Sequence, residues 1–380
     1  MTFIDRQEPL DRAIERVAAE PVVAVDTEAD SLHSYFDKVC LVQISTPAED
    51  LIVDPLADVD LSRFGAVLGN AGILKVLHGA DYDLRILNRD FGFTISNLID
   101  TSVCAQLLGY EAFGLAALLE RHFGVKLDKS HQRADWAMRP LTHNMLEYAV
   151  MDTRHLIPLA EKLRGELEAL GRWEWALEEF ARLENIRYEK EEVEEPFRRL
   201  KGLGGLDRRA LAIVQRLYDL RDALARKADR PPFKIFSNDI ILETAKVKPA
   251  MGADLEKVKA LPASQRARYG RDILRLVRES LALSEDALPQ KAEARTWIRD
   301  KALENRVNKL KAARDKIVDQ LKIDPAVLAP RHVLTAVAEA GTLDVPAMRE
   351  WQKRVVGDAL LRALEGWTWG QAGYSAKKGG

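Results

Sequence analysis

Cysteine is scarce in this sequence, and its scarcity excludes several kinds of site. Only Cys40 and Cys104 occur among the 380 residues, and both lie in apolar stretches. Two isolated cysteines cannot build a disulfide framework or a thiolate metal cluster. The histidines and cysteines also lack the clustering that a zinc site requires. A reducing, cytoplasmic compartment is therefore predicted.

Long apolar runs and nucleotide-binding loops are missing as well. No stretch is long and apolar enough to cross a bilayer, and residues 1–20 are charged and amphipathic, without the apolar core of a signal peptide. The pattern Gly-x-x-x-x-Gly-Lys-Ser/Thr is absent, and the glycines of residues 201–205 follow no predicted strand, which indicates a hinge. We therefore predict neither a membrane partner nor a small-molecule cofactor.

The length and the pattern of the first half indicate an α/β domain. A chain of 380 residues is long for one domain and suggests two or three. Short apolar runs bounded by turn residues predict buried strands at residues 22–25, 39–44, 51–53, 73–77 and 98–99. Helical patterns alternate with the later strands near residues 82–89, 102–108, 115–122 and 142–163. This order predicts a mixed sheet flanked by helices.

The second half has a different pattern, in which strand signals disappear after about residue 170. Two helical blocks of similar size, residues 206–283 and 293–366, each contain a proline-bearing break near the middle, as two copies of one module would. The predicted domains are residues 1–195, 196–290 and 291–370, and a disordered tail is predicted for residues 371–380.

Charge is distributed unevenly, although the net charge is only −2. An acidic stretch ends at Glu195, and a basic run follows it. The run contains Arg198, Arg199, Lys201, Arg208, Arg209, Arg216, Arg221, Arg226, Lys227, Arg230 and Lys234. Such asymmetry can mark a module that contacts nucleic acid, whereas any single charge of the run can belong to an ordinary solvated helix surface.

Asp26 and Glu28 lie two residues apart at the end of the first predicted strand. Alternate side chains of a strand share a face, so both carboxylates are expected to project together. Two adjacent carboxylates repel one another when they are buried, unless a cation lies between them. An isolated Asp-x-Glu is also common at polar strand ends, so this pair alone decides nothing.

Asp81 and Asp83 follow the fourth predicted strand, in the segment His-Gly-Ala-Asp-Tyr-Asp-Leu that opens a helix. This placement can present a carboxylate to a site at the sheet edge. One of the two aspartates is expected to cap the helix, with Asp81 as the candidate. The functional role is assigned to Asp83, in part on the family resemblance described below.

Tyr148 and Asp152 are four residues apart on a predicted helix and therefore share one face. Thr142 precedes this helix and is a candidate N-cap. A carboxylate one turn from a phenol, beside an apolar surface, needs a partner if it is buried. Taken alone, the pair is read more simply as an exposed Tyr and Asp on a surface helix.

The four carboxylates taken together indicate a site for two divalent metal ions. Hard cations such as Mg²⁺ prefer oxygen ligands and keep positions open for phosphate and water. Two such ions, about 3.5–4 Å apart, activate a water molecule and stabilise a leaving oxygen. Asp26, Glu28, Asp83 and Asp152 are the predicted ligands.

In this order, the segments around Asp26, Asp83 and Asp152 resemble the three exonuclease motifs of the ribonuclease D family, which belongs to the tyrosine-bearing DEDD exonucleases. Residues 41–44 resemble the second strand of that family. Residues 127–141, which contain Asp-Trp and Arg-Pro-Leu, resemble the segment before the third motif. Residues 206–283 resemble an HRDC domain, a helical nucleic-acid-binding module, and the block after residue 293 resembles a second, more divergent one.

The resemblance implies an RNase H-like α/β exonuclease domain followed by two all-α HRDC-like domains. It implies a 3′→5′ exoribonuclease that releases nucleoside 5′-monophosphates, with transfer RNA precursors and other stable RNA among its substrates. The four carboxylates would hold two Mg²⁺ or Mn²⁺ ions, with Asp26 bridging both, and Tyr148 would orient the attacking water. A monomer that acts in the cytoplasm is expected.

One departure and two alternatives accompany the resemblance. Ala29 stands where bacterial members often have Phe, and residues 29–35 are closer to the eukaryotic exosome-associated relatives, which leaves the substrate preference open. A DNA 3′→5′ exonuclease would use the same metal centre, because RNA and DNA differ at the 2′-OH. A catalytically inactive nucleic-acid-binding scaffold is disfavoured, because all five expected residues are present.

Overall fold

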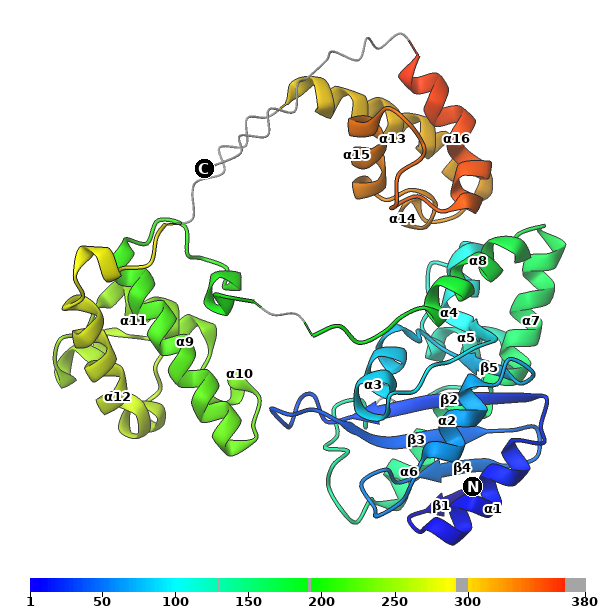
Figure 1. Ribbon diagram of the computed structural model, residues 1–380, viewed down its shortest axis with the longest axis horizontal. Coiled ribbons are helices and arrows are strands. Elements are labelled where there is room, and N and C mark those ends of the chain that lie inside the picture. Colours follow the sequence, from blue (N-terminus) through cyan, green and yellow to red (C-terminus); the bar gives the residue numbers. More distant parts are fainter. Residues whose placement is uncertain (129, 191–192, 292–299, 366–380) are drawn as a thin grey trace, which may run out of the picture.

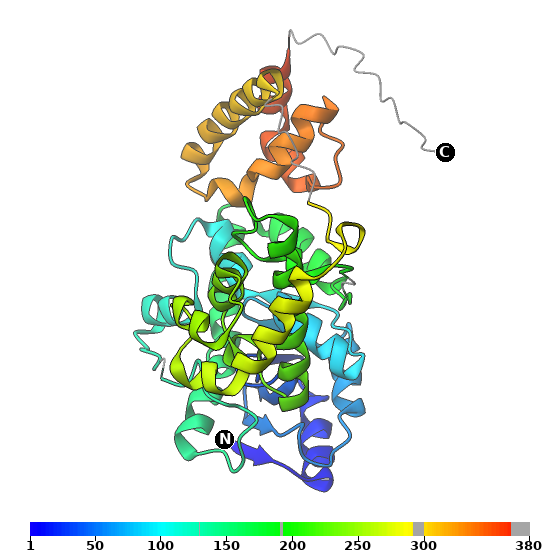
Figure 2. The same ribbon diagram turned by 90° about the vertical axis from the view of Figure 1, so that its left-hand side faces the viewer.

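The computed structural model describes the chain except for residues 129, 191–192, 292–299 and 366–380. The predicted tail, residues 371–380, therefore lies outside the described residues. An α/β domain, a first helical domain and a C-terminal helical domain follow one another along the chain (Figure 1). Figure 2 shows the C-terminal domain at one end of the molecule. Within the described ranges, no helix has the length and apolar character needed to span a membrane.

A six-stranded mixed sheet with the strand order β1-β4-β3-β2-β5-β6 forms the centre of the α/β domain. The strands are β1 (Thr2–Ile4), β2 (Val22–Ala29), β3 (Val39–Ser45), β4 (Asp50–Val53), β5 (Leu74–Leu77) and β6 (Leu98–Asp100). β3 is antiparallel to β2 and β4, whereas β5 and β6 continue the sheet parallel to β2. The five predicted strands are confirmed. The sequence interpretation missed β1, because three residues at a sheet edge carry almost no periodic signal.

Helices flank this sheet, as the sequence pattern predicts. They are α1 (Gln7–Val17), α2 (Ser62–Gly69), α3 (Asp81–Phe91), α4 (Thr101–Leu108), α5 (Leu115–Phe123), α6 (His143–Arg154), α7 (Leu156–Ala169) and α8 (Trp173–Glu184). The single helix predicted over residues 142–163 is wrong, because the chain breaks at His155 between α6 and α7. Pro158 explains the break, since proline has no N–H to donate to the carbonyl four residues earlier. Thr142 caps α6 as predicted, by accepting from the Met145 N–H.

The two helical domains share one design. The first contains α9 (Arg208–Ala228), α10 (Pro232–Ile235), α11 (Asn238–Val247) and α12 (Ala263–Leu281). The C-terminal domain contains α13 (Lys301–Leu321), α14 (Pro325–Leu328), α15 (Arg331–Ala340) and α16 (Glu350–Leu364). The first three helices have 21, 4 and 10 residues in both domains.

A buried arginine occupies the same place in the long first helix of each domain. Arg221 donates to the carbonyl of Phe236 after α10, and Arg314 donates to the carbonyl of Ala329 after α14. Each long helix also ends on a residue with a positive φ angle, which is 43° in the first domain and 53° in the C-terminal one. These contacts fix the corner between each long helix and the short helix that follows it, which is α10 in the first domain and α14 in the C-terminal one.

The C-terminal domain packs directly on the α/β domain. Trp351 of α16 stacks on Trp175 of α8 with 5.0 Å between ring centroids, and its Nε1 donates to Glu179 at 2.9 Å. Glu178 accepts from the first two backbone N–H groups of α16. Buried side chains of both domains belong to one continuous apolar cluster. The first helical domain instead has an apolar cluster of its own.

Two helix C-termini meet at the junction with the C-terminal domain. The Arg172 guanidinium donates to the carbonyl of Leu107 in α4 and to that of Leu321 in α13. A cation is favoured there, because helix C-termini carry partial negative charge. Gly109 ends α4 with a φ of +84°, and a Cβ at this position would lie 1.8 Å from the carbonyl oxygen of Lys322. The close approach therefore requires glycine.

Gly109→Ala is expected to destabilise the protein by about 2–5 kcal/mol, because it adds a clash of about 1–3 kcal/mol to a left-handed backbone penalty of about 1–2 kcal/mol. Gly124→Ala is the matched control, since Gly124 ends α5 with a φ of +68° and has nothing within 4 Å of its Cβ position. Thermal unfolding of the two variants measures the difference. Equal losses of stability would contradict the close approach to Lys322.

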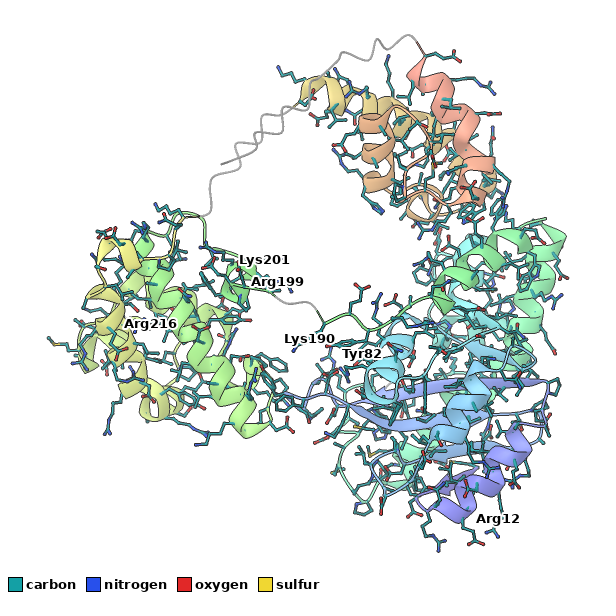
Figure 3. The ribbon with its side chains drawn as sticks, in the orientation of Figure 1. Arg12, Tyr82, Lys190, Arg199, Lys201 and Arg216 are labelled. Carbon is teal, nitrogen blue, oxygen red and sulfur yellow. The ribbon has the colours of Figure 1, made fainter. Side chains whose placement is uncertain are left out.

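Several arginines of the basic run bind groups of their own domain. Arg208 and Arg209 bind Glu285 and carbonyl groups at the end of the first helical domain, and Arg216 pairs with Glu279. These three guanidinium groups satisfy carbonyls and carboxylates of their own domain. Contact between the basic run and nucleic acid stays a prediction. Figure 3 shows Arg199 and Lys201 near the stretch that joins the α/β domain to the first helical domain.

Candidate active site

Two of the three acidic motifs meet at one point of the α/β domain. Asp26 and Glu28 lie on β2, and Asp152 lies on α6, which packs against β2, β3 and β4. One carboxylate oxygen from each of the three lies within 4.8 Å of the others. Residues more than a hundred positions apart in the sequence thus present three carboxylates to a common centre.

Asp83, from the remaining motif, lies beside this centre in the first turn of α3. It is buried and accepts a hydrogen bond from the hydroxyl of Thr27, the residue between Asp26 and Glu28. Its charge contributes to raising the pKa of Asp26. Asp83 is not one of the three carboxylates within 4.8 Å, so the structure places it adjacent to the group rather than inside it.

Asp81 does not cap α3, contrary to the expectation from the sequence. It accepts from the guanidinium of Arg85 one turn along the helix surface. The carboxylate of Asp100 accepts instead from the N–H groups of Gly79 and Ala80, which precede α3, and from those of Ser102 and Val103, which begin α4. One buried carboxylate therefore organises the start of two helices.

Tyr148 lies one turn before Asp152 and faces a cavity of about 420 Å³. Its ring contacts Trp136 with 5.9 Å between centroids and meets the edge of His131 at 5.8 Å. The cavity is lined by Lys126, Leu127, Asp128, Ser130, His131, Asn144, Glu147, Tyr148, Met151 and Asp152. Its volume falls in the range of about 300–1,000 Å³ that is typical of small-ligand pockets.

Burial raises the pKa of all four carboxyl groups, and neighbouring carboxylates raise it further, with Asp100 as the neighbour of Asp83. Desolvation is the largest cause for each, and the pKa is about 9 for Glu28, about 7 for Asp152 and about 6 for Asp83. The pKa of Asp26 is raised well above its ordinary value by desolvation and then by Asp83, Asp152 and Glu28. A cation would relieve this repulsion, and an all-carboxylate donor set fits hard divalent ions.

Burial, followed by the charges of Asp152, Glu28 and Asp26, raises the pKa of the Tyr148 phenol well above its ordinary value. The phenol therefore stays protonated at neutral pH. A protonated phenol can both donate and accept a hydrogen bond, which suits it to orienting a small molecule at the cavity wall.

Gln43 is a site neighbour that the sequence interpretation used only as part of a strand. It pairs directly with Asp26 across β2 and β3, so their side chains share a face of the sheet. Gln43 is fully buried, and its side-chain amide has no hydrogen-bond partner within the described chain. The sequence does contain a signal for Gln43, because its amide side chain interrupts the apolar run of residues 39–44. A buried polar group without a partner costs free energy, so an amide at such a position suggests a role in the site.

The raised pKa values predict that the metal-free fold loses stability as the pH rises. Folded carboxyl groups hold protons more tightly than the unfolded groups, whose pKa is about 4. Stability is therefore lost as the pH rises through about 6 for Asp83 and about 7 for Asp152. Asp152→Asn removes one repelling charge and should raise the melting temperature in EDTA by several degrees at pH 8, and by less at pH 6.

Thermal unfolding at both pH values, in EDTA and in Mg²⁺, measures this effect. Asp58→Asn, at an exposed position remote from the site in the sequence, is the control. Mg²⁺ should stabilise the wild type and the control but stabilise Asp152→Asn much less. The melting temperature of the wild type in EDTA, relative to that of Asp152→Asn, should fall between pH 6 and pH 8. If it does not, the assigned repulsion is contradicted.

Comparisons with known proteins agree with this geometry. A family model described as a 3′-5′ exonuclease matches residues 1–168, which include all five predicted site residues, and a model described as an HRDC domain matches residues 210–277. A ribonuclease D from Nitrobacter hamburgensis is 31% identical over 354 residues, which cover 92% of both chains.

Two solved structures are similar to the chain. The crystal structure of Escherichia coli RNase D, described as an exoribonuclease involved in structured RNA processing, has a TM-score of 0.71 at 28% identity and covers 97% of this chain and 99% of that one. The catalytic core of RRP6 from Trypanosoma brucei has a TM-score of 0.67 at 31% identity and covers 74% of this chain and 80% of that one.

Proposed function

The chain belongs to the ribonuclease D family of metal-dependent 3′→5′ exoribonucleases, and we propose that it trims the 3′ ends of structured RNA at a two-metal centre between β2, α3 and α6. The observation that supports the centre most directly is the convergence of Asp26, Glu28 and Asp152 within 4.8 Å. The cavity beside Tyr148 is of a size to receive a terminal nucleotide.

Asp26, Glu28 and Asp152 would hold the ions, with Asp83 completing the set from the first turn of α3. Asp26 would be shared between the ions, because Glu28 and Asp152 converge with it within 4.8 Å and Asp83 binds the neighbouring Thr27. Bound Mg²⁺ or Mn²⁺ supplies an activated water and neutralises charge on the phosphate. The carboxylates fix where the scissile phosphate can lie.

Tyr148 is proposed to orient the attacking water with its hydroxyl group. The phenol remains protonated because of its raised pKa, so it acts as a hydrogen-bonding group and not as a base. The contacts with Trp136 and His131 hold its ring. Positioning of this kind lowers the barrier by holding the reacting atoms in line.

The 3′→5′ direction is that of the family, and the product follows from it. A terminal nucleotide that fills the cavity is released as a nucleoside 5′-monophosphate when water attacks the phosphate on its 5′ side. RNA that ends in a 3′-phosphate is expected to be digested roughly tenfold more slowly or worse, because its added charge would enter a cavity lined by Asp128, Glu147 and Asp152.

The same RNA with a 3′-hydroxyl and a 5′-phosphate is the matched control, and timed samples separated by length give the measurement. Mononucleotides should appear at the first time point. Internal fragments appearing early would show an endonuclease instead.

We also propose the domain organisation, the RNA substrates, the assembly state and the location of the protein. The repeated helix lengths and the matched Arg221 and Arg314 contacts support a second, divergent HRDC-like domain, with domain bounds near residues 196–290 and 291–370. Structured RNA as the substrate is inferred from the description of the Escherichia coli relative. Transfer RNA precursors are proposed among these substrates because the family resemblance implies them. A monomer acting in the cytoplasm completes the proposal.

A further inference from the structure

The first helical domain touches the α/β domain through the loop that continues from the strand bearing Asp26 and Glu28. We name residues 30–38 the β2–β3 loop. In Figure 1 it extends from the sheet to the C-terminal end of α9 and to α10. Asp30 is fully buried and accepts from the Ser34 hydroxyl and from the backbone and ammonium groups of Lys38. The base of the loop is therefore fixed two residues after Glu28.

The tip of the β2–β3 loop is bound by the end of α9. The Oδ1 of Asp229 accepts from the N–H groups of Tyr35 and Phe36, each at 3.0 Å. The Tyr35 hydroxyl donates to Asp222 at 2.8 Å, and the Arg226 guanidinium lies 5.4 Å from the centre of the Tyr35 ring. The ring also packs against the apolar cluster of the first helical domain.

The other side of the loop contacts the wall of the active site. The Nε2 of His33 lies 3.1 Å from the carbonyl oxygen of Arg133, and Lys234 of α10 lies 3.3 Å from its Nδ1. Both contacts are satisfied when Nε2 carries the proton, donates to Arg133 and leaves Nδ1 to accept from Lys234. Residues 131–136, the mouth segment, begin with His131 and end with Trp136, and both of these side chains contact the Tyr148 ring.

The corner of the first helical domain that makes this contact has a counterpart. Asp229 ends α9 with a φ of 43°, and Lys322 ends α13, its equivalent in the C-terminal domain, with a φ of 53°. The backbone of Lys322 meets Gly109 of the α/β domain. Each helical domain therefore presents the same corner to the α/β domain, which marks that corner as a protein-docking feature.

We propose that the β2–β3 loop is a positioning element through which the first helical domain orients Tyr148. The contacts run from Asp229 to the loop tip, from His33 to the mouth segment, and from His131 and Trp136 to the Tyr148 ring. This inference rests on the proposed role of Tyr148. It assigns the first helical domain an effect on turnover that is separate from any binding of RNA by that domain.

Asp229→Gly tests the proposal, because it removes the carboxylate while suiting the positive φ angle. Asp229→Asn keeps an acceptor oxygen and tolerates the same backbone, so it should restore the contact. Lys227→Ala, an exposed change two residues away on α9, is the control. The probe is an RNA trinucleotide, which leaves few phosphates for a helical domain to bind.

We expect Asp229→Gly to lower kcat on the trinucleotide about tenfold with KM changed less than about twofold. Asp229→Asn and Lys227→Ala should stay within about twofold of the wild type. His33→Ala should lower kcat similarly, and the Asp229→Gly, His33→Ala double variant should lose little more, since residues acting through one chain of contacts are not additive.

Three results would overturn the inference. The first is a normal kcat of Asp229→Gly on the trinucleotide with weakened binding of long RNA, which would show that the first helical domain acts only by binding RNA. The second is an equal loss in Asp229→Asn and Asp229→Gly, and the third is full additivity with His33→Ala. A wild type that degrades neither the trinucleotide nor long RNA would instead refute the proposed function, and a normal rate in Tyr148→Phe would refute the role of Tyr148 on which the inference rests.

Discussion

Asp26→Asn is expected to lower kcat by about 10³-fold or more, because it removes one of the carboxylates that would hold the metal ions. The variant replaces a carboxylate by a neutral amide at the point where Glu28 and Asp152 converge. Neutral amides bind hard divalent ions less well than carboxylates, and the loss falls on the transition state as well as on ion binding. The fold should persist, because the change removes a repelling charge from a buried group.

Rates of RNA digestion in Mg²⁺, with a melting curve for each protein, measure this effect. Asp81→Asn is the control, since Asp81 lies on the surface of α3 and pairs with Arg85 away from the cluster. It should keep near-normal turnover. A folded Asp26→Asn variant with near-normal turnover would show that the centre is elsewhere.

Tyr148→Phe is expected to lower kcat by about 10²-fold, with KM for single-stranded RNA changed less than about threefold. The variant keeps the ring against Trp136 and His131 and deletes only the hydroxyl. Loss of an orienting hydrogen bond affects the attack of water more than the binding of RNA.

Tyr82→Phe is the matched control, because Tyr82 is an exposed tyrosine of α3, labelled in Figure 3. Steady-state kinetics on one RNA separate the two parameters. If Tyr148→Phe cleaves at a normal rate but binds poorly, Tyr148 is a substrate contact and not an orienting group.

The sheet and its acidic residues are readable from the sequence because their signals are local. Short apolar runs such as residues 22–25 and 39–44 predict strands that are buried on both faces. Asp26 and Glu28 follow the first of these runs, and Tyr148 and Asp152 share a helix face by spacing alone. The family resemblance then selects Asp83 over Asp81.

Features that depend on distant partners could not be read in this way. Gly109 looks like an ordinary helix end, and only the backbone of Lys322 shows why it is glycine. Arg209 and Arg216 look unpaired in the sequence, and only the structure places Glu285 and Glu279 beside them. Asp229 and Tyr35 are separated by almost two hundred positions and form no motif, so their contact emerges only in three dimensions.

The break at His155 has a different cause. Pro158 is visible in the sequence, yet proline is tolerated in the first turn of a helix, so the pattern fits either one interrupted helix or two. The structure shows two, and the break allows α6 to carry Asp152 over the sheet while α7 packs on α4.

The central claim is a metal-dependent exonuclease that prefers RNA, and digestion of matched single-stranded RNA and DNA oligonucleotides tests it most directly. Each is incubated with the full chain in Mg²⁺ or Mn²⁺, with and without excess EDTA. The account predicts that RNA is converted to nucleoside 5′-monophosphates from its 3′ end, that EDTA stops the reaction, and that DNA is degraded more slowly. RNA degradation that continues in EDTA, faster loss of DNA, or bound RNA that stays intact in both metals would contradict it.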